Sequence, residues 1–295
     1  MAKGARKRLS TPALIGWALA ALLLGVGLGV ALTQMGCERK APPKKAAPPR
    51  HEAEPPKPRA IDPRPAPPKA AKPPEPALPR LALIIDDLGY AEPELVTRLC
   101  AQPIAFTVAV LPYQEHTKES AEIAHKAGKE IILHLPMQGR EDKNPGPDAL
   151  VDGLTEQELR ERTRKALGEV PFIAGANNHM GSRLTADRPR MRIVLGEFKG
   201  RRLFFVDSRT TKETVAYDVA KELGLPSASR KVFLDDDKSF AEIEKQWNRA
   251  VALAQKDGEA IAIGHIYPET VEALEKLIPR SKVDVKFVVA GEIVK

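Results

Sequence analysis

The amino-acid sequence predicts an α/β fold for residues 81–295, a distorted (β/α) barrel of parallel strands in a single globular domain. Short apolar runs alternate there with amphipathic or capped segments, which is the pattern of strands connected by helices. Several runs are apolar throughout instead of alternating with polar residues, as in parallel strands that are covered on both faces. An open, doubly wound sheet is the alternative arrangement of the same elements.

Eight apolar runs have the composition of strands, which is enough for a closed or nearly closed barrel. They occupy residues 81–85, 104–111, 130–134, 172–176, 202–207, 231–234, 260–265 and 285–290. Thr155-Glu156-Gln157-Glu158 and Ser239-Phe240-Ala241-Glu242 are capping boxes that open two helices, the second of which should end near Gly258. A third helix is expected over 269–277, ended by Pro279.

The first 80 residues differ in composition and should form three segments. Residues 1–12 are a basic head, residues 13–32 are uncharged and apolar or small, and residues 33–80 form a linker rich in Pro, Ala and Lys. About 20 apolar residues can span a bilayer, and a basic head predicts that the head stays in the cytoplasm. The alternatives are a cleaved signal peptide, whose apolar core is usually about 7–15 residues, and a lipid anchor on Cys37.

The linker holds 15 of the 27 prolines, so we expect it to be a disordered, extended spacer. Residues 1–80 carry 15 Lys and Arg against 5 Asp and Glu, whereas the remainder carries 31 against 34. The positive charge therefore belongs to the tail, and no nucleic-acid partner is indicated. The sequence predicts a single-pass protein of a bacterial-type inner membrane, with its folded domain on the periplasmic side.

Acidic and histidine side chains stand at or just past the ends of four apolar runs. Asp86 and Asp87 follow the first run, while His134, His179 and His265 come at the ends of three later runs. Because the carboxyl ends of parallel strands face one cleft, we expect these side chains to converge. Asp and His together are typical of a divalent metal site with a catalytic acid or base, which indicates a metal-dependent hydrolase.

Neighbours in an extended segment point to opposite sides, so one Asp of the first pair would bind metal while the other takes a proton from water.

Other strand-end carboxylates have simpler interpretations. Asp207 would either orient a ligand or cap a helix. We interpret Asp235, Asp236 and Asp237 as a solvated turn that leads into a helix. No phosphate-binding Gly-rich loop or G-x-S-x-G elbow is present, which disfavours nucleotide and serine-hydrolase chemistry.

Six motifs occur in order along the domain. They are Ile84-Ile85-Asp86-Asp87-Leu88-Gly89-Tyr90, Leu111-Pro112-Tyr113, His134-Leu135-Pro136-Met137, Asn177-Asn178-His179-Met180-Gly181-Ser182-Arg183, Phe205-Val206-Asp207-Ser208-Arg209 and Ile263-Gly264-His265. Together they resemble the divergent polysaccharide deacetylase family over nearly all of 81–295. That family is a distant relative of the metal-dependent chitooligosaccharide and peptidoglycan deacetylases, which use a distorted (β/α) barrel.

The resemblance implies a role for each matching residue. The first Asp of the pair is the general base in those enzymes and the second is a metal ligand, so these roles fall on Asp86 and Asp87. A histidine ligand falls on His134. A late histidine, the general acid toward the leaving amine, falls on His265.

The sequence departs from the classical pattern in several places. The second histidine ligand should come four residues after the first, where this chain has Gln138, and His179 is the natural substitute. The classical Arg-x-Pro and Asp-x-x-Asp-Trp motifs are missing, and Arg183 and Asp207 are the candidates to replace them. The residues expected to orient the ligands or contact the substrate are Asn178, Arg183, Asp207 and Tyr113.

The function that the resemblance implies is removal of acetyl groups from an envelope polysaccharide. The substrate would be an acetylated glycan or peptidoglycan, and the expected cofactor is Zn²⁺, with cobalt, manganese or iron as alternatives. The alternative function is a catalytically inactive module that binds glycan or an envelope protein partner.

Overall fold

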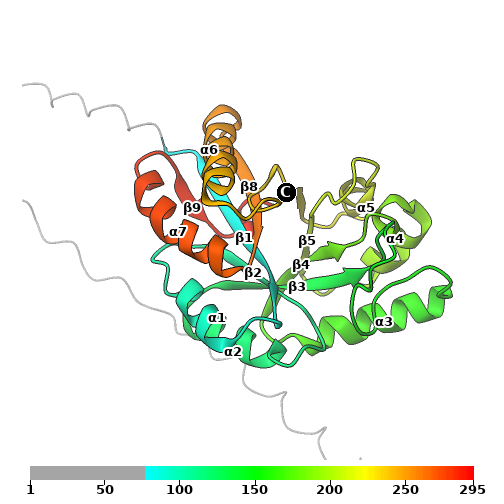
Figure 1. The fold of residues 1–295 in the computed structure, drawn as a ribbon. Helices are drawn as coiled ribbons and strands as arrows, with labels where there is room; N and C mark the ends of the chain where they lie inside the picture. The colour runs from blue at the N-terminus through cyan, green and yellow to red at the C-terminus, as the bar shows by residue number, and fades with distance from the viewer. Residues whose placement is uncertain (1–76) are drawn as a thin grey trace, which may run out of the picture. The chain divides into compact units, whose positions relative to one another are not determined.

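The computed structural model describes residues 77–295, where one parallel sheet curls into a distorted barrel surrounded by helices (Figure 1). All neighbouring strands pair in parallel, in the order β6-β5-β4-β3-β2-β1-β8-β7, and β9 pairs with the start of β1. The strands are β1 (Arg80–Leu88), β2 (Thr107–Val110), β3 (Glu130–Met137), β4 (Ile173–Met180), β5 (Phe204–Asp207), β6 (Ser227–Ser229), β7 (Val232–Phe233), β8 (Glu259–His265) and β9 (Lys286–Val288). The predicted fold class is confirmed.

One stretch of chain, residues 227–233, pairs with both edges of the curled sheet, and we call it the closing segment. β6 pairs with β5 and β7 pairs with β8, and only Arg230 and Lys231 separate these two short strands. The backbone N–H of Arg230 donates to Asp207 in β5, and that of Lys231 donates to Ile261 in β8. The same stretch of chain therefore contacts both edges of the sheet, so the sheet is curled into a distorted barrel and is not an open, doubly wound sheet. The sequence did not predict β6, because Ser-Ala-Ser contains no apolar run.

Apolar side chains form two layers, one inside the barrel and one between the barrel and the helices. The inner layer consists of Ala82, Ile84, Ala109, Ile132, Phe204, Val206, Ile261, Ile263, Val288, Ala290 and Ile293. The short 3₁₀ helix η2 (Ala290–Glu292) supplies part of it. Gly175 in β4 has room for no side chain, because a Cβ there would lie 2.5 Å from the ring of Phe204.

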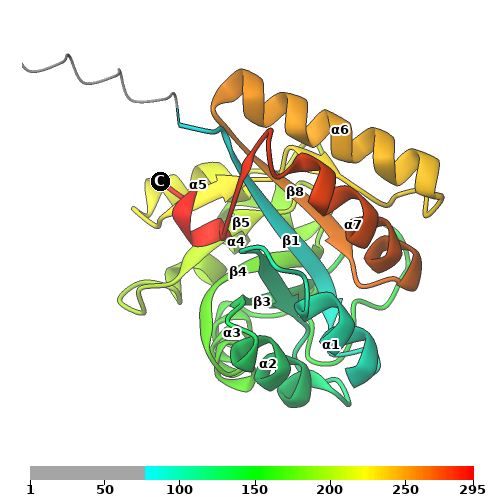
Figure 2. The ribbon, with the colours of Figure 1, turned by 90° about the vertical axis from the view of Figure 1, so that its left-hand side faces the viewer.

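The helices surround the barrel, and α6 lies beside α7 on the outside of β1 and β8 (Figure 2). Their bounds are α1 (Pro93–Cys100), α2 (Thr117–Lys126), α3 (Glu156–Glu169), α4 (Arg188–Gly196), α5 (Ala216–Glu222), α6 (Phe240–Asp257) and α7 (Pro268–Ser281). The capping box of Thr155 is present, with the Thr155 N–H donating to Glu158 at 2.7 Å. Helix α6 begins after Ser239 and stops before Gly258 as predicted, but the Ser239 side chain makes no capping hydrogen bond.

The prediction that Pro279 ends the third helix is wrong, since α7 continues to Ser281. Proline removes one backbone N–H from the helix. Tertiary contacts outweigh that loss here, because Leu277 and Ile278 are buried and Ser281 accepts a hydrogen bond from the Trp247 indole at 2.8 Å.

The predicted basic head, membrane span and Cys37 lie outside the described residues, as does almost all of the linker. These segments and the location they imply stay predictions. Within residues 77–295, no helix combines the length and the apolar character needed to cross a membrane.

Candidate metal centre

The inward-facing side chains change from apolar to polar toward the carboxyl ends of the strands, and we call this polar end of the barrel its mouth. Alternate residues of a strand share one face, so Asp86 follows Ala82 and Ile84 on β1, and His265 follows Ile261 and Ile263 on β8. The register places Asp86 directly beside His265, and His134 beside Asn177. β3 and β4 run past the predicted strand ends to Met137 and Met180, because the pairing of these two strands continues through the polar residues.

Both carboxylates of the Asp86-Asp87 pair face the site, contrary to the alternation we predicted. The backbone of Asp87 has a φ of 66°, and the β1–β2 register shifts between Ile85 and Leu88. This bulge adds a residue on the β1 side, which turns the second carboxylate toward the same mouth as the first. A left-handed backbone is strained for a residue other than glycine, and such strain is common at functional sites.

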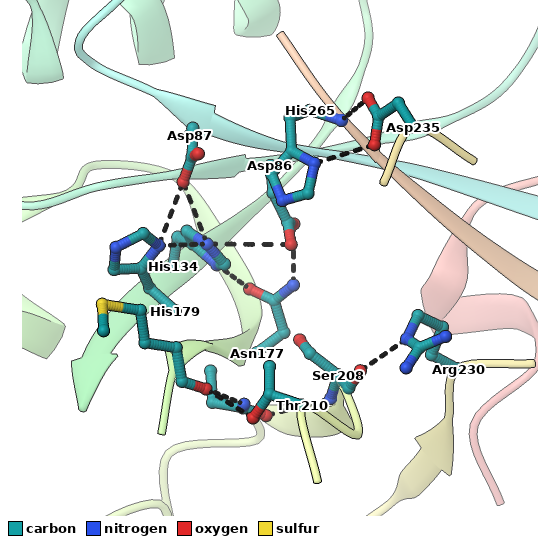
Figure 3. Close-up of polar contacts among 12 residues, drawn as sticks. Asp86, Asp87, His134, Asn177, His179, Ser208, Thr210, Arg230, Asp235 and His265 are labelled. Atoms are coloured by element: carbon teal, nitrogen blue, oxygen red, sulfur yellow. Dashed lines mark hydrogen bonds and ion pairs between the residues drawn. The ribbon is translucent and has the colours of Figure 1, made fainter. Parts of the chain in front are cut away.

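Asp87, His134 and His179 aim one atom each at a common point (Figure 3). Oδ1 of Asp87 lies 3.3 Å from Nε2 of His134 and 3.1 Å from Nδ1 of His179, and the two nitrogens are 3.1 Å apart. Tetrahedral ligands with bonds of about 2.1 Å stand about 3.4 Å from each other. Oδ1 of Asp87 is buried and has no hydrogen-bond partner among residues 77–295. The three residues therefore fit a divalent metal ion.

Asn177 joins the ligand set to Asp86. Its side-chain N–H₂ donates to Oδ1 of Asp86 at 2.8 Å, and its carbonyl oxygen lies 2.7 Å from Nδ1 of His134. Because that oxygen can only accept, the proton of neutral His134 stays on Nδ1 and the lone pair of Nε2 faces Asp87. Sequence reasoning selected Asn178 and missed Asn177, although Asn177 is two residues from His179 and therefore on its face of the strand.

His265 is held by a second carboxylate that we had misassigned. Asp235 is buried; one oxygen lies 2.8 Å from Nδ1 of His265, and the other accepts the His265 backbone N–H at 2.7 Å and the Thr270 hydroxyl at 2.7 Å. The interpretation of Asp235 as part of a solvated turn is wrong. It comes directly after the apolar run that contains β7 and Leu234, just as Asp86 comes after the apolar run 81–85, and this was the available sequence signal.

The electrostatics differ from residue to residue in this cluster. Burial raises the pKa of Asp86, although His134 and His265 act against it. Burial would also raise the pKa of Asp87, yet the imidazoles of His134 and His179 hold it far below its usual range. For His265, burial opposes protonation, but the hydrogen bond and charge of Asp235 raise its pKa to about 9. At neutral pH His265 is therefore cationic and able to give up a proton.

The other predicted site residues lie outside this cluster. The Gln138 side chain accepts the backbone N–H of Asp152, and Arg183 pairs with the Asp152 carboxylate. Asn178 accepts the Ser208 backbone N–H at 2.9 Å, which ties the end of β4 to the end of β5. Asp207 accepts the Thr214 hydroxyl at 2.9 Å and the Tyr217 backbone N–H, so it caps α5.

Tyr113 also stands apart from the three ligand residues. Burial raises its pKa to about 12, and its buried hydroxyl has no hydrogen-bond partner among the described residues. Its ring lies 5.1 Å from the ammonium group of Lys165 on α3.

A curled parallel sheet with an Asp-His-His cluster at the ends of its strands defines the class: a distorted α/β-barrel domain with a candidate metal centre. The sequence profile of the divergent polysaccharide deacetylases matches residues 83–294, and the chain belongs to that family. The predicted resemblance is thereby confirmed.

Several uncharacterized proteins are similar to the chain. It is 37% identical over 214 residues to the uncharacterized protein YibQ of Escherichia coli K12, a match covering 72% of this chain and 67% of that protein. It is 35% identical over 214 residues to an uncharacterized protein of Haemophilus influenzae, covering 72% and 76%. A crystal structure of an uncharacterized Agrobacterium tumefaciens protein shares the fold, with a TM-score of 0.70, 21% identity, and coverage of 75% and 91%.

Proposed function

We propose that the protein is a metal-dependent hydrolase that removes acetyl groups from an envelope polysaccharide. The convergence of Asp87, His134 and His179 on one point, with Asp86 and His265 beside it, carries this proposal. We call β1, β3 and β4 with Asp87, His134 and His179 the ligand side of the mouth. The acid side is formed by β7 and β8 with Asp235 and His265.

The ligand side would hold the ion, and Zn²⁺ suits its one oxygen and two nitrogen donors. When bound, a divalent ion supplies Lewis acidity that polarises the acetyl carbonyl and acidifies a water molecule. Asn177 keeps His134 in the tautomer that presents Nε2 and keeps Asp86 oriented.

Asp86 and His265 would move the protons. Asp86 lies 3.7 Å from Nε2 of His134 and is the base that takes a proton from the attacking water. The water oxygen bonds to the acetyl carbon, the C–N bond breaks, and acetate and an amine are released. Protonated His265, held by Asp235, donates to the departing nitrogen.

The domain would act on an acetylated glycan or on peptidoglycan in the cell envelope. The family of the chain supports a polysaccharide substrate. The predicted anchor and linker support an extracytoplasmic position on the inner membrane, which protease protection in intact and osmotically opened cells would test.

Metal analysis and acetate release from the purified full-length chain test the proposal together. We expect about one zinc per chain and acetate release from acetylated glycan oligomers, with Asp86→Asn retaining the metal and losing turnover. Metal without turnover in the wild type would reject the hydrolase and favour a glycan-binding module. A wild-type protein that shows no bound metal and no turnover would reject the metal centre itself.

A further inference from the structure

Basic side chains differ in their partners between the two sides of the mouth. On the loops after β3 and β4, Arg140 pairs with Glu213 and Arg183 pairs with Asp152. Arg230 and Lys238 on the acid side, and Arg209 on the adjoining loop after β5, have no carboxylate within ion-pairing distance among residues 77–295. Unpaired cations beside a candidate active site are available to an anionic ligand.

Arg230 is the most constrained of these cations. It lies in the closing segment, and its guanidinium donates to the carbonyl oxygen of Ser208 at 2.5 Å (Figure 3) and to that of Arg209 at 2.7 Å. The same group lies 3.6 Å from the centre of the Phe233 ring. Nε and Nη2 are occupied by these carbonyls, whereas Nη1 has no hydrogen-bond partner among the described residues. A half-buried guanidinium held in this way is preorganised for a carboxylate or phosphate.

The aromatic ring of Phe233 lies between Arg230 and His265. The Phe233 ring stacks on His265 with centres 5.8 Å apart. Tyr267 lies on His265 as well, with centres 5.4 Å apart, and the ammonium group of Lys238 stands 3.3 Å from the centre of the Tyr267 ring. Positive charges therefore flank His265 through two different rings.

A second arginine, Arg209, lies next to Arg230, whose guanidinium donates to the Arg209 backbone carbonyl. It follows β5 in a left-handed backbone conformation with a φ of 49°, and its side chain is exposed. Burial lowers the pKa of Arg230 to about 10, and the charge of Arg209 acts in the same direction against the opposing effect of Asp236. The charges of Asp236, Asp207 and Asp86 partly balance that of Arg230 from a distance, but none of them forms an ion pair with it within residues 77–295, so an anionic ligand can still bind there.

We propose that Arg209 and Arg230, together with Lys238, bind an anionic group on a sugar next to the acetylated one. The substrate is then an acidic glycan that carries a carboxylate or a phosphate, and not a neutral N-acetylated polymer. The link to acetyl removal rests on the proposed function. Anion binding can be measured without turnover, so the two proposals can fail separately.

The test is calorimetric titration of the full-length chain with glucuronate and with inorganic phosphate, in the metal-loaded and the chelator-treated states. The variants are Arg230→Gln and Arg209→Gln, and the matched control is Arg249→Gln, an exposed arginine on α6. We expect binding of at least one anion to persist after chelation. Each arginine variant should lower that affinity about tenfold, while the control changes it less than about twofold.

Each result has a definite meaning. Preference for glucuronate indicates a uronate-type substrate, and preference for phosphate indicates a phosphorylated glycan. Anion binding that disappears on chelation is metal coordination and would overturn the subsite. Unchanged binding in Arg209→Gln would also overturn it, since the exposed Arg209 side chain can be replaced even if Arg230→Gln does not fold.

Discussion

The ligand side and the acid side of the mouth are built in different ways. The three ligand residues come from β1, β3 and β4, which follow one another closely in the chain and in the sheet. His265 ends β8 and Asp235 follows the neighbouring strand β7, where its carboxylate accepts the His265 backbone N–H and contacts Nδ1 of the ring. The first side is thus a donor set shaped for an ion, and the second is a proton donor tuned by a buried carboxylate. Substitutions on the two sides should therefore separate metal binding from proton transfer.

The largest effect is expected from His134→Ala on the ligand side. It removes one of three donor atoms, so metal content should fall from about one per chain to near zero and turnover should fall at least about 1000-fold. Chelation should lower the melting temperature of the wild type but hardly change that of the variant. His125→Ala is the matched control, because His125 is exposed. Full metal content in His134→Ala would show that the ion binds elsewhere.

Asp86→Asn should abolish proton transfer and leave metal binding intact, because the neighbouring Asp87 is the metal ligand. The amide keeps the size of the side chain but cannot take a proton, so turnover should fall about 10²–10⁴-fold. The metal content should stay that of the wild type, because Oδ1 of Asp87 is the ligand. Asp142→Asn, at an exposed position, is the control. Loss of metal in Asp86→Asn would make Asp86 a ligand as well.

Asn177→Ala should weaken the ligand side without abolishing it. Loss of the contact to Nδ1 of His134 frees the imidazole to adopt the other tautomer, and metal affinity should fall about 10–100-fold. Competition with a fluorescent chelator measures this. Asn178→Ala is the neighbouring control, since Asn178 binds backbone groups of Ser208 and Met180. Equal losses in both variants would indicate general damage to β4.

Asp235→Asn should act on the acid side through pH. The pKa of His265 is raised to about 9, so the folded protein holds this proton more tightly than the unfolded chain. The resulting stabilisation, on the order of 1–3 kcal/mol, is present below about pH 6.5 and is lost as the pH rises through about 9. NMR titration should show the His265 pKa falling in Asp235→Asn but not in Asp236→Asn. The free energy of unfolding that Asp235→Asn loses relative to the wild type should become smaller above pH 9. A loss that does not change with pH would contradict the ion pair between Asp235 and His265.

The smallest effects concern helix caps on the two sides. Thr155 of α3 accepts from Glu158 N–H and completes a capping box, whereas Ser239 of α6 makes no side-chain cap. Thr155→Ala should therefore cost about 1 kcal/mol in the free energy of unfolding, and Ser239→Ala should stay within about 0.5 kcal/mol. Urea denaturation measures both. Equal costs would mean that Ser239 does cap α6.

The sequence predicted the ligand side better than the acid side, and the reason is physical. Asp87, His134 and His179 stand at or near the ends of apolar runs, and a run of buried residues is visible without knowing its neighbours. Asp235 becomes the partner of His265 only because β7 pairs with β8. β7 has only two residues, too few for the sequence to show which strand it pairs with. The turned carboxylate of Asp87 depends on a bulge that no residue pattern marked. Asn177 needed only the alternation of the strand once β4 was known to extend to Met180.

The order of the strands also has a consequence for how the domain forms during synthesis. The ligand residues lie between positions 87 and 179, within the consecutive strands β1 to β4, while closure requires residues 227 to 265. The chain emerges from the ribosome amino end first, so all three ligand residues are synthesised well before the closing segment. We therefore expect a metal ion to be able to organise the first half of the sheet while the proton donor, its carboxylate and the basic side chains around them are still to be made.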